Sequence, residues 1–111
     1  MSFGALQQRR APITQRVIDR WNAAIHTITS CVLCHRFGVQ ASHSNMLRGK
    51  SQKADPWFQA ALCPECHHAI DNGTDLSQLE RREIHFRANS LTLGALIAAG
   101  TLILADGPRL P

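Results

Sequence analysis

The chain has 111 residues, a formal net charge of +4, 44% hydrophobic residues and four cysteines. This length corresponds to one small domain, which we expect to span residues 1–111. Such a domain buries limited apolar surface, so a bound metal ion would add usefully to its stability. The modest positive charge suits a polyanionic partner, although many proteins carry as much. No uncharged stretch reaches the roughly 20 residues of a membrane-spanning helix, so we expect no membrane association.

A basic segment opens the chain. Residues 1–11 include Arg9 and Arg10 and have the composition of a mobile tail. They contain no apolar core of the length that an export signal requires. We therefore expect a reducing, cytoplasmic compartment.

An apolar repeat predicts a helix within the N-terminal segment 12–29. Pro12 suits a first helical turn, and the helix itself is expected over residues 12–27. Its apolar face would consist of Ile13, Val17, Trp21, Ala24 and Ile25. This helix and the apolar C-terminal segment are the two candidate faces for a homodimer.

The four cysteines form two Cys-x-x-Cys pairs, Cys31 with Cys34 and Cys63 with Cys66. Four thiolates at this spacing complete the tetrahedral coordination of a structural zinc ion. Two disulfides, or a redox-active pair, are the alternatives, and a reducing compartment favours zinc. The 28 residues 35–62 between the pairs exceed the roughly 15 to 20 of simple zinc ribbons. We therefore expect this segment to carry a function of its own.

The region 30–73 is expected to form a zinc-braced core. Its elements are expected in this order: a turn and strand over 36–43, a loop over 44–56, a strand over 57–62 and a helix over 64–73. The order of knuckle, hairpin, loop, knuckle and helix is the treble-clef arrangement. With helices added at both ends, it predicts a small α+β fold.

Residues 74–105 are expected to form C-terminal helices. Thr74 or Asp75 should cap the first of them, because Asp75-x-x-Gln78 and Ser77-x-x-Glu80 both resemble capping boxes. Leu76, Leu79 and Phe86 are expected to form its apolar side.

A second C-terminal helix is expected to start at Ser90 and to end near Gly100. The uncharged stretch from Leu91 to Ala105 would form this buried helix and a short extended piece. His26 and His85 fall on expected helices, and we expect no chemical role for either.

His67 and Asp71 stand four residues apart on the helix expected after the second cysteine pair. This spacing places both on one helix face, close enough to share a cation. A nitrogen and a carboxylate oxygen suit a divalent ion such as Mg, Mn, Ni or Zn. A surface hydrogen bond between the two side chains is the alternative. The zinc site would tether this helix to the strand that carries His43.

With these residues the chain resembles the HNH endonuclease family over residues 30–72. In that family the first motif ends a strand in a histidine, as at His43, and the last histidine follows the second knuckle. Leu62-Cys63-Pro64-Glu65-Cys66-His67 matches this last motif. Within the family, the chain is most similar to small prophage-encoded proteins related to the Ref-type, RecA-dependent nuclease.

The resemblance implies a ββα-metal core and hydrolysis of DNA phosphodiester bonds in a bacterial or phage-infected cell. His43 would be the general base, and His67 and Asp71 would bind a catalytic divalent cation. Asp55 would be a further ligand or would orient His43. A recombination protein is a partner implied by the resemblance alone. At two positions the chain departs from the family: Ser42 replaces a common ligand, and Phe58 stands where the central Asn is expected.

Three cations follow His43 in the expected loop: Arg48, Lys50 and Lys53. They would bind flanking phosphates with largely sequence-independent affinity. A solvated loop without a partner is the alternative for these residues. A catalytically inactive, zinc-binding nucleic-acid-binding module is the alternative for the whole chain.

Overall fold

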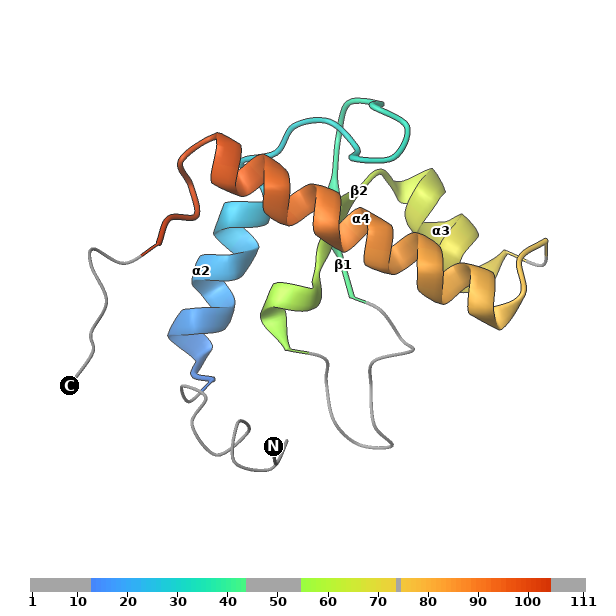
Figure 1. Ribbon diagram of the computed structural model, residues 1–111, viewed down its shortest axis with the longest axis horizontal. Helices are drawn as coiled ribbons and strands as arrows, with labels where there is room; N and C mark the ends of the chain where they lie inside the picture. Colours follow the sequence, from blue (N-terminus) through green and yellow to red (C-terminus); the bar gives the residue numbers. More distant parts are fainter. Residues whose placement is uncertain (1–12, 44–54, 74, 105–111) are drawn as a thin grey trace.

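A computed structural model of the protein describes residues 13–43, 55–73 and 75–104. Within this part, three α-helices and one two-stranded antiparallel sheet form a small α+β fold, which confirms the expected class (Figure 1). The elements are α2 (Gln15–Ile25), β1 (Gln40–Ser42), the 3-10 helix η2 (Pro56–Phe58), β2 (Ala60–Leu62), α3 (Pro64–Asn72) and α4 (Gln78–Ala98). The expected basic tail 1–11, residues 44–54 of the expected loop, and Thr74 lie outside the described residues.

Helix α2 is shorter at both ends than the expected helix over 12–27. Thr14 has extended backbone and accepts a hydrogen bond from the Val17 N–H at 3.3 Å, so the helix begins at Gln15. After Ile25 the chain turns, because the Thr27 hydroxyl donates to the Ala24 carbonyl at 2.6 Å. Ile25 is buried and anchors the helix to the core.

The first cysteine pair lies in a tight reversal of the chain. The Cys31 N–H donates to the Arg36 carbonyl and the Cys31 carbonyl accepts from the His35 N–H, both at 2.9 Å. His35 and Gly38 adopt positive φ angles of 65° and 94°, which allow the turn to close. Residues 36–39 complete this turn, so the observed strand is shorter than the one expected over 36–43.

Strands β1 and β2 pair so that Ala41 lies opposite Ala61. The Ala61 N–H donates to the Thr92 hydroxyl of α4 at 3.0 Å, and its carbonyl accepts from the Val32 N–H at 3.1 Å. These bonds cover the outer edge of β2. All three residues of β2 are fully buried, and they contribute alternately to two hydrophobic clusters.

The strand expected over 57–62 begins later than expected. Pro56 opens a 3-10 turn that includes Trp57 and Phe58, since proline at the first helical position fixes a helical φ. The buried Gln59 amide donates back to the Pro56 carbonyl at 2.8 Å. Only the residues after this turn join the sheet.

Helix α3 begins at Pro64, as expected, and Cys63 is its N-cap. The Cys63 sulfur accepts a hydrogen bond from the Cys66 N–H at 3.4 Å. At the other end, the Arg81 guanidinium donates to the carbonyls of Asp71 and Gly73. These bonds satisfy backbone oxygens that a helix end leaves without partners.

Helix α4 is one continuous helix, so the expected break at Ser90 is wrong. Ser77 caps it, and the predicted capping box of Ser77 with Glu80 is confirmed. Neither Thr74 nor Asp75 is its cap. Ser90 is an exposed interior residue, and a serine there weakens a helix by only a few tenths of a kcal/mol.

The expected apolar side of α4 is also wrong, because Leu79 and Phe86 are 63% and 39% exposed. The buried face consists of His85, Ala88, Asn89, Thr92 and Leu96. This face packs across β2, with α3 beside its N-terminal half and α2 beside its C-terminal half (Figure 1). Small and polar side chains suit this position because they approach the strand backbone and satisfy its polar groups. Within the described residues, no helix is both long and apolar enough to cross a membrane.

Candidate metal centre and adjoining histidines

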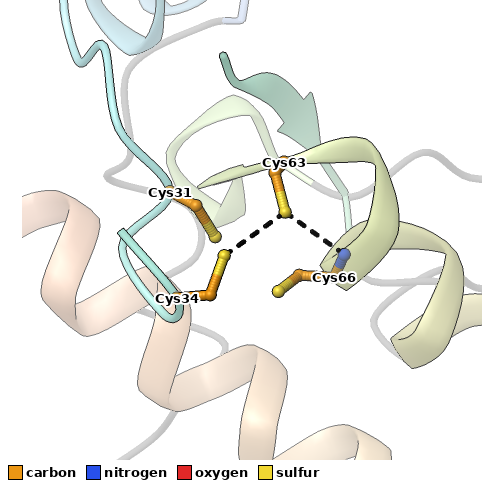
Figure 2. Close-up of side chains that lie close together, drawn as sticks. All are labelled: Cys31, Cys34, Cys63 and Cys66. Atoms are coloured by element: carbon orange, nitrogen blue, oxygen red, sulfur yellow. Dashed lines mark hydrogen bonds between the residues drawn. The ribbon is translucent and has the colours of Figure 1, made fainter. Parts of the chain in front are cut away.

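The four cysteine sulfurs converge on one point, as Figure 2 shows. All are free thiols, and all four sulfur atoms lie within 4.8 Å of one another. The sulfurs of Cys34 and Cys63 are 3.5 Å apart. A zinc ion with bonds of 2.3 Å needs sulfur–sulfur edges of about 3.8 Å. The geometry therefore fits a four-thiolate zinc site at Cys31, Cys34, Cys63 and Cys66.

Three parts of the chain meet at this centre. The first pair comes from the chain reversal after α2, which the bond between Val32 and Ala61 ties to β2. Cys63 directly follows β2, and Cys66 lies in the first turn of α3. A metal ion here would join the reversal, the hairpin and α3 in one rigid unit.

The protein environment shifts the pKa values of the Cys31, Cys63 and Cys66 thiols in different directions. Burial opposes ionisation of Cys31, but backbone hydrogen bonds at Cys63, Cys34 and Leu33 lower the pKa of its thiol to about 6. Burial raises the pKa of Cys63 and of Cys66, and the neighbouring sulfurs of Cys31 and Cys34 raise both further. Four thiolates at this separation therefore need a cation to offset their charge, which is what a divalent metal ion supplies.

His67 and Asp71 form the pair that their spacing predicts. The His67 Nε2 lies 3.0 Å from the Asp71 Oδ2, and the two side chains are 28% and 17% exposed. The His67 Nδ1 lies 2.9 Å from the Oε1 of Gln40, the first residue of β1. An amide oxygen can only accept, so Nδ1 donates this bond. Nε2 then faces the carboxylate either as a second donor or with a cation between them.

Gln40 is a site residue that the sequence reading missed. Its partner His67 is 27 residues away along the chain, and only the pairing of β1 with β2 brings them together. The alternation of side chains along β1 is the one sequence signal that could have suggested it.

His43 and Asp55 lie at the two ends of the segment that follows β1. His43 is exposed and directly follows the last residue of the strand. Asp55 is half-buried and is the N-cap residue of η2. Among the described residues, the four cysteines alone form a group of three or more candidate ligands within 4.8 Å of one another. The structure therefore does not gather Asp55 with His67 and Asp71, and the roles given to Asp55 and His43 stay predictions.

The three cations Arg48, Lys50 and Lys53 lie outside the described residues. Their place relative to His67 therefore also stays a prediction.

His85, for which we expected no chemical role, lies in the core beside β1. It is 1% exposed, and its Nε2 lies 3.1 Å from the carbonyl oxygen and 3.5 Å from the hydroxyl of Ser42. Burial lowers its pKa, which keeps the ring neutral. Our expectation of no chemical role assumed an isolated helical histidine. The structure instead places the ring against the residue that precedes His43.

A cleft of about 280 Å³ lies between α2 and the C-terminal end of α4. Its lining includes Arg20, Trp21, Leu96 and Leu102 and no residue of the predicted site. The predicted site residues therefore do not line this cleft.

No protein-family model, curated protein or solved structure matches the chain. The function proposed below therefore rests on the motif residues and on their geometry.

Proposed function

We propose that the protein is a metal-dependent endonuclease of the HNH type, which hydrolyses phosphodiester bonds of DNA on a zinc-braced, treble-clef ββα core. The observation that carries this proposal is the pair of His67 and Asp71 on one face of α3. Gln40 connects this pair to β1, and the residue that follows β1 is His43. A histidine–carboxylate pair thus lies on the helix that adjoins the strand of a candidate general base.

The geometry of the pair fits a divalent cation. Two ligands of an octahedral ion with bonds of about 2.1 Å are about 3.0 Å apart, and the His67 Nε2 and Asp71 Oδ2 are 3.0 Å apart. With a cation bound, the bond to Gln40 would keep the proton on Nδ1 and leave the Nε2 lone pair to the metal, as outer partners of metal ligands commonly do. A cation held there would stabilise the charge that develops on the phosphate and on the leaving oxygen.

The protein's own residues would supply the remaining steps. His43, as a neutral imidazole, would accept a proton from the attacking water. Arg48, Lys50 and Lys53 would hold the flanking phosphates, which makes binding sensitive to salt. The four-thiolate site would keep β1 and α3 in a fixed relation, so that the base and the cation act on the same phosphate.

Nicking of supercoiled plasmid in Mg²⁺, Mn²⁺, Ni²⁺ or Zn²⁺ tests this proposal. We expect His43→Ala and His67→Ala each to lower the nicking rate by at least about a hundredfold, because each removes a group that acts in the transition state. His26→Ala is the matched control, since His26 is exposed at the end of α2. Full nicking by His43→Ala, with zinc still bound, would remove His43 from the mechanism.

The second candidate is a zinc-binding module that binds nucleic acid without cleaving it. The observation in its favour is that only two candidate ligands meet at His67, and that Ser42, in place of a ligand, is fully buried. Salt-sensitive binding of DNA by wild type, with no nicking in any of the four metals, would select this function. Under it, His43→Ala would bind DNA as wild type does.

A further inference from the structure

Helix α4 presents a row of polar side chains to the hairpin. His85, Asn89 and Thr92 follow at intervals of four and three residues and so share one helix face. Their exposed fractions are 1%, 7% and 0%. Polar groups are costly to bury, so a small core that contains three of them in a row uses them for their hydrogen bonds.

The His85 ring donates one hydrogen bond and leaves its other nitrogen unpaired. The Ser42 carbonyl oxygen can only accept, so the Nε2 at 3.1 Å carries the proton. Nδ1 is buried and has no hydrogen-bond partner among the described residues. An apolar side chain would fill this space without an unpaired atom. The bond to Ser42 is therefore what a histidine contributes at this position.

This bond acts on the peptide group that leads into His43. The Ser42 carbonyl and the His43 nitrogen belong to one planar unit, because the peptide bond does not rotate freely. Ser42 is also the last paired residue of β1, opposite Ala60. A hydrogen bond that fixes the Ser42 carbonyl therefore fixes the point from which the His43 side chain departs.

Asn89, one turn further along α4, fixes the chain at the other end of the segment. Its Nδ2 donates to the carbonyls of Trp57 at 2.8 Å and of Gln59 at 2.9 Å. Helix α4 thus holds the backbone on both sides of residues 43–55, and His85 is the anchor next to His43.

We propose that His85 is a positioning residue that holds His43 in place through the Ser42 carbonyl. This inference rests on the proposed nuclease function, in which His43 is the general base. His85 does not contact the reacting atoms; it acts through the backbone. Loss of its donor would release the Ser42 carbonyl beside the base, and small displacements of a catalytic group have large effects on rate.

Three variants separate positioning from plain stability. His85→Leu removes the donor at similar size, and His85→Gln restores an N–H donor of comparable reach. Thr92→Val removes the bond to Ala61 on the same helix face and serves as the structural control. We expect His85→Leu to lower kcat for plasmid nicking at least about tenfold with KM within about twofold of wild type. His85→Gln and Thr92→Val should nick within about threefold of the wild-type rate at a temperature where all are folded.

A measurement independent of cleavage accompanies these rates. The ¹⁵N backbone order parameter of His43 should fall by at least about 0.2 in His85→Leu and remain at the wild-type value in Thr92→Val. Nicking by His85→Leu at the wild-type rate, or an unchanged order parameter at His43, would overturn the inference. If wild type does not nick DNA, the nuclease proposal fails, and the order parameter alone decides whether His85 holds His43.

Discussion

A buried histidine with one unpaired nitrogen lowers the free energy of unfolding of its protein relative to an apolar residue of the same shape. The cost is typically about 1–3 kcal/mol. His85 is such a residue, and it is also the one side chain of α4 that bonds to the strand end beside His43. The free energy of unfolding of natural proteins is small, so this cost is a sizeable fraction of the total stability. Under the role proposed for it, His85 lowers the stability of the protein and in return holds the Ser42 carbonyl in place.

The neutral state of His85 has a consequence for stability that depends on pH. Burial lowers its pKa, with the Ser42 bond and Asp71 acting against that shift and His67 and His43 adding to it. The unfolded chain therefore binds a proton at about pH 6.5, while the folded chain does so only at lower pH. The stability that the neutral ring contributes is fully present above about pH 6.5. It is lost as the pH falls toward the pKa of His85 in the folded protein.

We therefore expect the free energy of unfolding of wild type to fall more steeply than that of His85→Gln between about pH 7 and 5.5. Urea denaturation at a series of pH values, with excess zinc, measures both slopes. The other histidines and the cysteines are common to the two proteins, so their titration cancels in the difference. Parallel slopes would show that folding does not lower the pKa of His85.

Sequence periodicity identified the pair of His67 and Asp71 but neither Gln40 nor His85. The first pair is local, four residues apart on one helix, and helix geometry alone brings the side chains together. Gln40 meets His67 across 27 residues and Ser42 meets His85 across 43. Contacts of this kind depend on strand register and on how α4 crosses the hairpin, which no local pattern specifies.

At the scale of the elements, α4 shows which of two serines in the sequence begins a helix. The capping box at Ser77 is a reciprocal pair of hydrogen bonds, from the Ser77 N–H to Glu80 at 2.9 Å and from the Glu80 N–H to Ser77 at 3.2 Å. Ser90 has the residue type of a cap but lies in the interior of the continuous helix Gln78–Ala98. The N-cap of α4 is Ser77.

Alanine substitutions at the two serines test this difference. Ser77→Ala removes the cap and should lower the free energy of unfolding by about 1 kcal/mol. Ser90→Ala replaces an exposed interior serine and should leave it unchanged or raise it by up to about 0.5 kcal/mol. Urea denaturation measures both. A loss at Ser90 as large as that at Ser77 would indicate that a helix begins at Ser90.

The apolar face of α4 was predicted poorly because its core-facing residues are not its most apolar ones. Leu79 and Phe86 point to solvent, whereas Asn89 and Thr92 are buried. The buried side chains satisfy backbone groups at Ala61 and Trp57, which a leucine could not do. Hydropathy patterns assume a purely apolar partner surface, and here the partner is the polar backbone of a hairpin.

At the scale of the whole molecule, the cysteines are part of the core as well as candidate ligands. Cys31 and Cys63 are fully buried and belong to the cluster that contains Leu62 and Ile70. The second cluster, around Ile25 and Leu96, contains no cysteine. Two small clusters provide little hydrophobic stabilisation for a chain of this size, so a metal ion bound by the cysteines of the first cluster would contribute a large share of the stability.

We expect the purified protein to contain one zinc ion per chain and Cys63→Ser to contain none. Cys63 also has a structural role, because its sulfur caps α3 through the Cys66 N–H and lies 3.5 Å from that of Cys34. Its loss should abolish the cooperative thermal transition, as should removal of zinc by a strong chelator. Metal analysis and circular dichroism on heating measure both effects.

His35→Asn is the control for this substitution. His35 directly follows Cys34 with φ at 65°, a conformation that asparagine tolerates, and its exposed ring is a possible competing ligand. If four thiolates complete the shell, this variant keeps one zinc ion and the wild-type Tm. A zinc-free Cys63→Ser that still melts cooperatively at the wild-type Tm would mean that the hydrophobic clusters and α4 hold the fold without metal. The relation of β1 to α3, and with it the approach of His43 to His67, would then depend on the hydrogen bonds of Gln40 and His85 instead of on zinc.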